Sequence, residues 1–351
     1  MIGLALRNRL AGFGRRGRDV VDFAVDLGTA RTVVVERGSG VIFDEPSLCC
    51  FRGYDAIPGF VAAGDRAAQF VGRASRPLKI VRPLHNGVVA DMAAARELIR
   101  FATRTVRAKR PLGRTRAIFG VPADATLAER RALVAAAQDA GIGDPRVVPE
   151  PLLAAFGAGL DVDAPRGRML VDCGAGVAEA VVISLGGICA AGSHRGGGDE
   201  LTRSLVDHFR TRRRFHIGMA TAEQLKLEAS TRLAAGEKGA SVTVRGLSSS
   251  TGLPARLGIP LAELEPVWER HIGAVAAMVH GVLQQTSPEL SNDVLEEGIL
   301  VTGAAGDTAM LAQRIEERTG VTTRVFGEAA KAVVNGLAAA LDLPLSFAHL
   351  D

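Results

Sequence analysis

The feature that most constrains the fold of this sequence is an internal repeat. An apolar segment, an Asp, a Gly and a second apolar segment occur in VDLGTARTVVV and again in VDCGAGVAEAVVIS. The two aspartates, Asp26 and Asp172, stand 146 positions apart. Apolar, β-branched runs that are bounded by glycine are typical of β-hairpins. A repeat at this spacing predicts a duplicated pair of domains that face a shared cleft.

The turn of the first hairpin carries groups that suit a phosphate ligand. Gly28 permits a tight turn and a close backbone approach, and the backbone N–H groups with the Thr29 hydroxyl can face a phosphate. Asp26, at the strand end, is placed to hold Mg²⁺ through water. The second turn repeats this design with Asp172, Gly174 and Gly176, and a third glycine turn spans residues 303–306. We therefore expect two facing hairpins that clamp a polyphosphate.

The rest of the chain alternates apolar runs with helical patterns, which predicts an α/β fold. We expect helices over residues 91–108, 123–140 and 328–342, and buried strands over 117–122 and 298–303. Residues 52–87 are interpreted as a small inserted subdomain with irregular structure. Residues 201–290 mix helices with a Gly/Ser-rich stretch, 246–254, that is interpreted as a loop.

The charge distribution argues against a nucleic-acid partner. The net charge is +4, and residues 1–19 alone carry +4, so the remaining 332 residues are neutral on balance. A DNA-binding domain normally carries its basic excess on the folded surface. Aromatic residues make up only 4% of the chain, fewer than a stacking platform for single strands requires. The basic run at 210–215 is interpreted as a solvated helix end, with a nucleic-acid site as the alternative.

The basic N-terminal segment also carries an apolar stripe, formed by Ile2, Leu6, Leu10 and Phe13. Such a segment is typical of helices that lie in a membrane interface; the alternative is a frayed or self-packed terminus. Leu112, within the basic stretch 104–116, is a second candidate membrane contact, with a solvated loop as the alternative. No apolar run reaches the ~18 residues that a spanning helix needs.

The cysteines and histidines give no metal signal in the sequence. Cys49, Cys50, Cys173 and Cys189 lack zinc-ligand spacing, and a neighbouring pair is a poor disulfide candidate. Reduced thiols in a cytosolic protein are expected. The seven histidines show no cluster in the sequence.

Several further motifs make the sequence recognisable. IFDEPS (42–47), KIVRPLHNGVVADM (79–92), PEPLLAAFGAGL (149–160), RGGGDE (195–200), TAEQLKLE (221–228) and GILVTGAAG (298–306) follow in this order. Together with the repeat, they resemble the MreB/Mbl family of bacterial actins, within the actin-fold ATPase superfamily, over residues 20–345.

The resemblance implies an actin-like, ribonuclease H-like duplicated fold, with two domains and four subdomains around a nucleotide cleft. It divides the chain into the N-terminal segment 1–19; subdomain IA at 20–50, 86–164 and 330–351; subdomain IB at 51–85; subdomain IIA at 165–200 and 267–329; and subdomain IIB at 201–266.

The resemblance also assigns site residues for ATP and Mg²⁺. The nucleotide-binding residues are Asp26, Gly28, Thr29, Ala30 and Arg31 in the first loop; Asp172, Gly174, Ala175, Gly176 and Val177 in the second; Gly197, Gly198 and Asp199 near the ribose; Glu223, Gln224, Leu225 and Lys226 on a helix at the adenosine; and Gly303, Ala304, Ala305 and Gly306 at the adenine. Asp26 and Asp172 would hold Mg²⁺ through water. Glu150 falls where the family orients the attacking water, a role that suits phosphoryl transfer; a helix-capping acid is the alternative.

The sequence departs from the family in these same loops. The second loop usually reads DIGGGTTE, and here DCGAGVAE has lost both Thr hydroxyls. The third usually reads TGGGA, and here Ala304 and Ala305 replace two glycines. A Cβ in a turn with positive φ costs about 1 kcal/mol, and each lost hydroxyl costs about as much. Arg31, where Asn is usual, would offset part of this loss. We expect weakened nucleotide binding and slow or absent hydrolysis.

The functional expectation follows from the resemblance. It implies a homopolymer filament on the inner face of the cytoplasmic membrane that scaffolds the cell-wall (peptidoglycan) synthesis machinery and determines cell shape. A degenerate, non-hydrolysing regulator or scaffold is the alternative. A DnaK-type chaperone ATPase and a sugar kinase are less favoured, because we find no substrate-binding β-domain after residue 351 and no sugar-binding motif.

Overall fold

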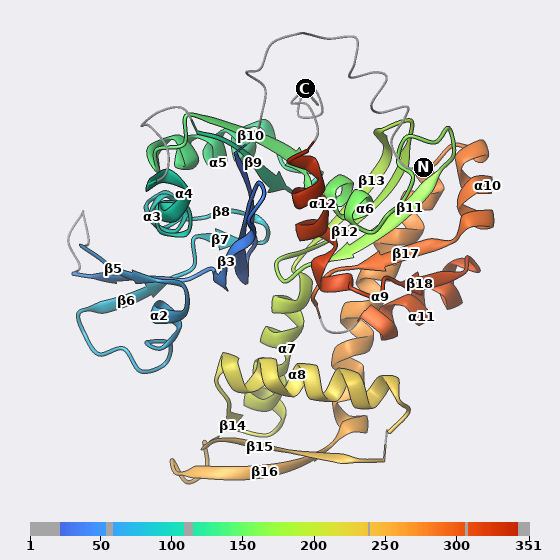
Figure 1. The fold of residues 1–351 in the computed structure, drawn as a ribbon. Helices are drawn as coiled ribbons and strands as arrows, with labels where there is room; N and C mark the ends of the chain where they lie inside the picture. The colour runs from blue at the N-terminus through green and yellow to red at the C-terminus, as the bar shows by residue number, and fades with distance from the viewer. Residues whose placement is uncertain (1–21, 54–58, 109–114, 238, 306–307, 343–351) are drawn as a thin grey trace.

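The computed structural model describes residues 22–53, 59–108, 115–237, 239–305 and 308–342, and two five-stranded sheets form its centre (Figure 1). The first sheet, ordered β10-β9-β1-β2-β3, consists of β1 (Phe23–Leu27), β2 (Arg31–Glu36), β3 (Gly40–Pro46), β9 (Arg116–Val121) and β10 (Asp144–Pro149). The second, ordered β13-β12-β11-β17-β18, consists of β11 (Arg168–Cys173), β12 (Val177–Ser184), β13 (Gly187–Arg195), β17 (Ile299–Thr302) and β18 (Thr323–Val325).

The two sheets have the same topology. In the first, β1 is antiparallel to β2 and parallel to β9, and β9 is parallel to β10. In the second, β11 is antiparallel to β12 and parallel to β17, and β17 is parallel to β18. Asp26 and Asp172 occupy corresponding places on β1 and β11. The duplication predicted from the repeat is therefore confirmed.

Two helices, α6 (Glu150–Gly157) and α12 (Ala332–Ala340), lie between the sheets (Figure 1). Leu153 and Leu337 pack on the first sheet, whereas Ala154 and Ala332 pack on the second. The two helices touch backbone to backbone, because a Cβ at Gly336 would overlap the Leu153 carbonyl oxygen. They form an apolar layer that both sheets share.

Further helices cover the outer faces of the sheets. On the first sheet these are α3 (Met92–Ala102), α4 (Arg104–Ala108) and α5 (Leu127–Asp139). On the second sheet and the unit below it in Figure 1 these are α7 (Gly197–Arg212), α8 (Met219–Ala234), α9 (Leu261–Gln285), α10 (Pro288–Glu297) and α11 (Thr308–Thr319).

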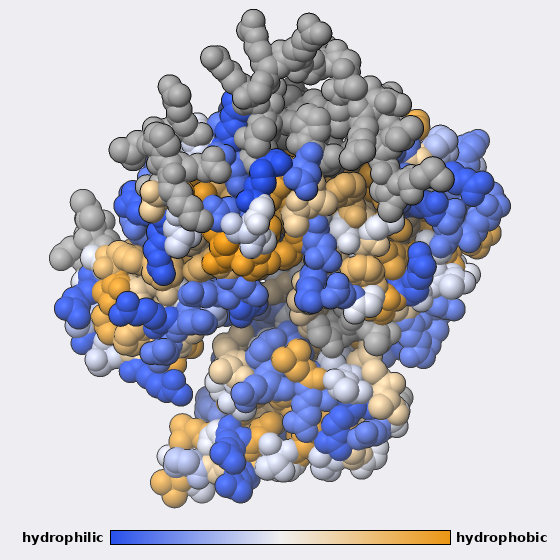
Figure 2. All heavy atoms as spheres, in the orientation of Figure 1, coloured by the Kyte–Doolittle hydropathy of each residue, from blue (hydrophilic) through white to orange (hydrophobic). Residues whose placement is uncertain are grey.

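Two smaller sheets stand beside the central ones. One contains β4 (Cys49–Arg52), β5 (Gly59–Ala63) and β6 (Leu78–Val81) next to α2 (Gly64–Ala68), and the other contains β14 (Phe215–His216), β15 (Ser241–Ser248) and β16 (Pro254–Pro260). A short hairpin pairs β7 (Leu84–His85) with β8 (Val88–Val89), and a 3-10 turn, η1 (Ala329–Lys331), precedes α12. Figure 2 shows an open notch between the parts that carry the two small sheets.

Some local expectations need correction. The subdomain at 52–87 is not irregular, because β5 and β6 flank β4 in a regular sheet. The expected loop at 246–254 is mostly a hairpin, since β15 extends to Ser248 and β16 begins at Pro254. The helix expected from residue 123 begins at Leu127, where Thr126 and Glu129 form a capping box. The helix expected over 91–108 is interrupted at Thr103.

The membrane residues expected from the sequence lie outside the described residues. These are Ile2, Leu6, Leu10, Phe13 and Leu112. Among the helices that the structure describes, none combines the length and the apolar character needed to cross a bilayer.

The contact between α6 and α12 predicts unequal effects for two glycine substitutions. Gly336→Ala forces these helices apart and should lower the free energy of unfolding by about 2 kcal/mol or more. Gly281→Ala, on α9, adds a methyl with nothing within 4 Å and should raise stability by about 0.5 kcal/mol. Urea unfolding of the two variants tests this, and equal stabilities would contradict the close contact.

Candidate functional site

Four carboxylates from different elements gather where the two sheets approach each other. Asp26 on β1 lies on the same strand face as Ala24, which packs into the shared apolar layer. Asp172 on β11 likewise lies on the face of Leu170, and Glu179 on β12 on the face of Val181. Glu150 is the first residue of α6, within that layer. The duplicated strands therefore bring like charges together at one end of the shared core.

Burial raises the pKa of all four carboxyl groups, and neighbouring negative charges add to this effect at Asp26, Glu150 and Glu179. Burial, followed by the charges of Asp172 and Asp44, raises the pKa of Asp26 to about 7. Burial raises the pKa of Glu179 to about 8, against the hydrogen bond from Ala123 N–H. The pKa of Glu150 rises well above its usual range through burial and then the charges of Asp26, Glu179 and Asp172. The pKa of Asp172 rises through burial and is opposed by a hydrogen bond from Thr302.

The surrounding groups hold these carboxylates without neutralising them. Thr302 Oγ1 donates to Asp172 Oδ1 at 2.8 Å, and Ala123 N–H donates to Glu179 Oε1 at 2.7 Å. Gly120 on β9 leaves room for Glu150, whose Cγ would lie 2.8 Å from a Cβ at that position. Glu179 Oε2 is buried with no hydrogen-bond partner among the described residues. Clustered carboxylate oxygens with one unpaired oxygen fit a hard divalent cation such as Mg²⁺.

The first loop is fixed by a buried serine from the segment DEPS. Ser47 Oγ donates to the Gly28 carbonyl at 2.6 Å, and Ser47 N–H donates to the Ala30 carbonyl at 2.9 Å. The hydroxyls of Ser47 and Thr32 lie 2.8 Å apart. The turn is therefore rigid before any ligand arrives, which lowers the entropic cost of binding.

The first and second loops face each other directly. Gly176 packs so closely on Thr29 that any side chain at Gly176 would overlap the Thr29 hydroxyl. That hydroxyl accepts a hydrogen bond from Gly87 N–H at 3.0 Å. The second turn is closed by a hydrogen bond of 2.9 Å from Gly174 N–H to the Val177 carbonyl. The structure thus brings the two sequence-predicted turns together.

Arg31 has its own partner. Its Nε donates to Asp44 Oδ1 at 2.7 Å, and its Nη2 donates to the Asp44 carbonyl at 2.7 Å. This bidentate hold on β3 means that the guanidinium must leave Asp44 before it can compensate for a weakened phosphate loop.

The first turn of α7 meets the second turn, α8 and the third turn. Gly198 N–H donates to the Gly174 carbonyl at 3.0 Å, and Asp199 N–H donates to the Ala175 carbonyl at 2.8 Å. Lys226 on α8 is only 3% exposed, and its Nζ lies 3.3 Å from the Gly198 carbonyl oxygen. The predicted ribose, adenosine and second phosphate-loop segments are therefore adjacent.

The remaining predicted residues divide into those at this junction and those away from it. Lys226 Nζ pairs with Glu223 Oε1 at 2.9 Å. A Cβ at Gly198 would lie 3.4 Å from Ala305 Cα, so the third turn also reaches the junction. Leu225, a predicted nucleotide-binding residue, lies on α8 with its side chain buried in the core, and its role stays a prediction. Gln224 is exposed, and Gly306 lies outside the described residues.

Beside the third turn lies an open hollow of about 450 Å³, lined by Gly303, Ala304 and residues 327–331. Its size is within the range of small-molecule sites, about 300–1,000 Å³.

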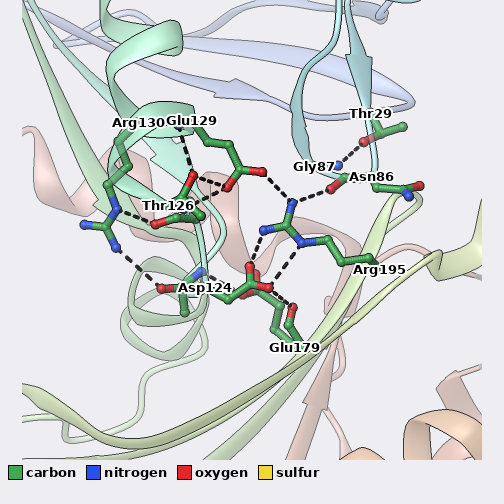
Figure 3. Close-up of polar contacts among 12 residues, drawn as sticks. Thr29, Asn86, Gly87, Asp124, Thr126, Glu129, Arg130, Glu179 and Arg195 are labelled. Atoms are coloured by element: carbon green, nitrogen blue, oxygen red, sulfur yellow. Dashed lines mark hydrogen bonds and ion pairs between the residues drawn. The ribbon is translucent and has the colours of Figure 1, made fainter.

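A polar network, which the sequence did not reveal, joins the two halves of the molecule near these carboxylates (Figure 3). Arg195, at the end of β13, pairs with Asp124 at 2.7 Å and with Glu129 at 3.3 Å. It also donates to the Asn86 carbonyl at 3.4 Å. Glu179 joins the same halves through Ala123. In the sequence Glu179 is the last residue of the altered second loop, and no local pattern there indicated its role.

The fold and these loops agree with a known family, because the model of the MreB/Mbl protein family matches residues 20–346. This chain belongs to the MreB/Mbl family. It is 33% identical over 333 residues to the cell shape-determining protein MreB of Escherichia coli K12, covering 93% of this chain and 95% of that protein. It is 29% identical to the cell shape-determining protein Mbl of Bacillus subtilis, covering 92% and 96%.

Solved structures confirm the actin-like fold. MreB5 of Spiroplasma citri bound to ADP superimposes with a TM-score of 0.81 at 25% identity, covering 91% of this chain and 95% of that one. The MamK double helical filament gives a TM-score of 0.71 at 20% identity, covering 92% and 99%, and supports the fold alone.

The altered loops of this MreB/Mbl protein do not carry the backbone strain expected from their alanines. Among the described residues, positive φ without glycine occurs only at Asn86, Leu185 and Arg214. Ala175, Ala304 and Ala305 thus adopt ordinary conformations, and the expected strain is wrong. Gly303, at φ 104°, is the residue that needs glycine in the third turn, since a Cβ there would overlap Cys173. Lost hydroxyls and added methyl groups remain the only reasons for weaker binding.

The raised pKa of Glu179 predicts a pH-dependent penalty. A carboxyl group with a higher pKa in the folded state destabilises the protein as pH rises from about 4.5, its unfolded value, to about 8. Glu179→Gln keeps an acceptor for Ala123 N–H and removes this penalty. Its free energy of unfolding should match the parent protein near pH 4.5 and exceed it by up to about 4 to 5 kcal/mol at pH 8.5.

Urea unfolding at the two pH values, without divalent cations, measures the difference. Millimolar Mg²⁺ should stabilise the parent protein more than the variant at pH 8.5. If the difference in the free energy of unfolding does not change with pH, folding does not raise the pKa of Glu179, and this prediction is wrong.

Proposed function

We propose that this chain is an actin-like filament protein that binds ATP with Mg²⁺ at the junction of its two halves. The observation that carries the proposal is the convergence of Asp26, Glu150, Asp172 and Glu179 beside the facing first and second loops. Buried carboxylates that repel one another hold a cation, and backbone N–H groups of glycine turns hold phosphates. MreB5 of Spiroplasma citri has been solved with ADP and with AMPPNP, which supports a nucleotide at this place in the fold.

In this proposal each segment of the site has its own task. The first and second loops hold the phosphates, and Asp26 and Asp172 hold Mg²⁺ through water. The junction of Gly198, Lys226 and Ala305 receives the ribose, and the hollow beside Gly303 receives the base. Bound Mg²⁺ supplies positive charge that neutralises the phosphates and the carboxylates together. The proposed four-subdomain division, with the boundaries given above, is supported by the two five-stranded and two three-stranded sheets among the described residues.

Hydrolysis would depend on the ionisation of Glu150. A carboxylate orients water by accepting its hydrogen bond. Burial and the neighbouring acids raise the pKa of Glu150 and so disfavour its ionised form, which a bound cation would favour. The second loop also lacks the hydroxyls usual in the family, so fewer donors contact the phosphates. We infer weak nucleotide binding and slow hydrolysis, with turnover tied to cation binding.

Calorimetry with Mg-ATP tests the nucleotide site. We expect a Kd weaker than about 10 µM and little phosphate release over the binding experiment. Asp172→Asn should weaken binding at least about tenfold, because it removes one charge that faces the cation. Asp207→Asn, at a solvent-exposed pair with Arg210 on α7, is the control and should bind like the parent. Tight binding with steady turnover would refute the proposed weakening, and no binding at all would refute the site.

We further propose that the filament lies on the inner face of the cytoplasmic membrane and scaffolds peptidoglycan synthesis to control cell shape. The named roles of the MreB and Mbl relatives support the cell-shape function. The filament title of MamK supports polymerisation on this fold. The basic stripe at residues 2–13 supports attachment, because apolar side chains and arginines together bind an anionic surface.

Vesicle co-sedimentation tests the attachment. Deletion of residues 2–18 should release the protein from anionic vesicles, and neutral vesicles should retain little of either form. If the truncated protein still co-sediments completely, these residues do not anchor it, and Leu112→Ser then tests the second candidate contact.

A non-polymerising regulator is the second candidate, favoured by the loss of both hydroxyls from the second loop. Electron microscopy of the full chain with lipid, with and without ATP, separates the two. Filaments on lipid support the first proposal, and monomers under every condition support the second.

A further inference from the structure

Away from the carboxylate cluster, three metal-ligating side chains meet on the second half of the molecule. His194 lies near the end of β13, Glu200 in the first turn of α7 and His271 on α9. One ligand atom from each lies within 4.8 Å of the other two. In the sequence, His194 and Glu200 are six positions apart and His271 is far away, so no spacing pattern revealed them.

The geometry of this cluster approaches a coordination site. His194 Nε2 lies 2.9 Å from Glu200 Oε2, and the rings of His194 and His271 meet edge to face with centroids 6.0 Å apart. Tetrahedral zinc holds its donor atoms about 3.3 Å apart, given bonds near 2.0 Å. Small side-chain rotations would bring the ligand atoms from separations of up to 4.8 Å to the spacing that zinc needs. A bound metal would then replace the hydrogen bond between His194 and Glu200.

The supporting structure holds these ligands in place. His271 is 8% exposed and stands between buried Trp268 and Ile272 on α9. The Glu200 carboxylate lies over Gly196, where any side chain would overlap it. The side chains of His194 and Glu200 remain partly exposed, at 26% and 46%, which gives an ion a route from solvent.

The strand geometry separates this cluster from the polar network between the halves. Successive strand residues point to opposite faces, so Arg195 reaches Asp124 across to the first half while its neighbour His194 faces α9. The cluster therefore belongs to the second half alone, and it lies on three elements that a bound ion would tie together.

We propose that His194, Glu200 and His271 form a binding site for a divalent transition-metal cation of the zinc type. Two imidazoles and one carboxylate are a ligand set that zinc uses with a fourth, open position for water. Imidazole nitrogen favours such ions over Mg²⁺, which prefers oxygen ligands. The site is thus chemically distinct from the proposed magnesium site, and its existence does not depend on nucleotide binding.

Zinc titration of the full chain against a chromophoric chelator tests the proposal. Cys189 is the exposed thiol among the described cysteines, so Cys189→Ser serves as the parent to remove binding by sulfur. We expect one equivalent of Zn²⁺ to bind and Co²⁺ to give the visible absorption of a tetrahedral site. His194→Ala and His271→Ala should each weaken zinc binding by roughly tenfold or more. His280→Ala, elsewhere on α9, is the matched control and should bind like the parent.

A second measurement covers the case in which the buried His271→Ala variant does not fold. Zn²⁺ should raise the thermal unfolding midpoint of the parent and have little effect on His194→Ala or Glu200→Gln, whose altered side chains are partly exposed. Excess Mg²⁺ should not displace the zinc. Unchanged zinc affinity in His194→Ala, or displacement by Mg²⁺, would overturn the site whatever the result with ATP.

Discussion

The backbone contact between α6 and α12 is the constraint on which the rest of the structure depends. Gly157 and Gly336 let the helices approach until peptide groups touch, so the pair is thin enough to serve both sheets at once. Leu153 and Leu337 fill one side and Ala154 and Ala332 the other. Because each sheet packs on the same two helices, the ends of β1 and β11 are brought near each other.

That proximity has an electrostatic cost. Ala24 and Leu170 face the apolar layer from β1 and β11. Asp26 and Asp172 lie two residues further along these strands, on the same faces. Neither carboxylate has a basic side chain among its main electrostatic partners; the other acids raise the pKa of Asp26 and of Glu150. Such an arrangement is unfavourable by itself and becomes favourable when a cation occupies it. The repulsion between carboxylates is therefore concentrated at one place, where a bound cation can relieve it.

The contacts between the halves differ in kind on the two sides of this cluster. The helices provide an apolar contact that does not depend on charge, whereas Arg195 with Asp124 and Glu129 provides a polar one. Partly exposed ion pairs contribute little stability each, so the polar side is the easier one to open.

The sequence by itself determined the duplication, since period-two apolar strands around Asp-X-Gly turns are a local pattern. It also indicated the first and second loops and placed Glu150 at the start of a helix, whereas the start of α5 was expected four residues too early. The hairpin of β15 and β16 was not predicted, because its serine- and glycine-rich turn has the composition of a long loop and the strand pairing is not visible in the sequence. The roles of Glu179 and Arg195 were not predicted either, since their partners Ala123 and Asp124 are distant in sequence.

Only the tertiary structure decided which residues meet. Ala175, Ala304 and Ala305 were expected to strain their turns, yet φ depends on the path of the chain and proved ordinary there. Leu225 lies on the predicted helix, but its side chain faces the core, because packing decides which face of a helix is buried. His271 reaches His194 only through the packing of α9 on β13. Local patterns specify elements, whereas contacts between residues distant in sequence follow from how those elements bury their apolar faces.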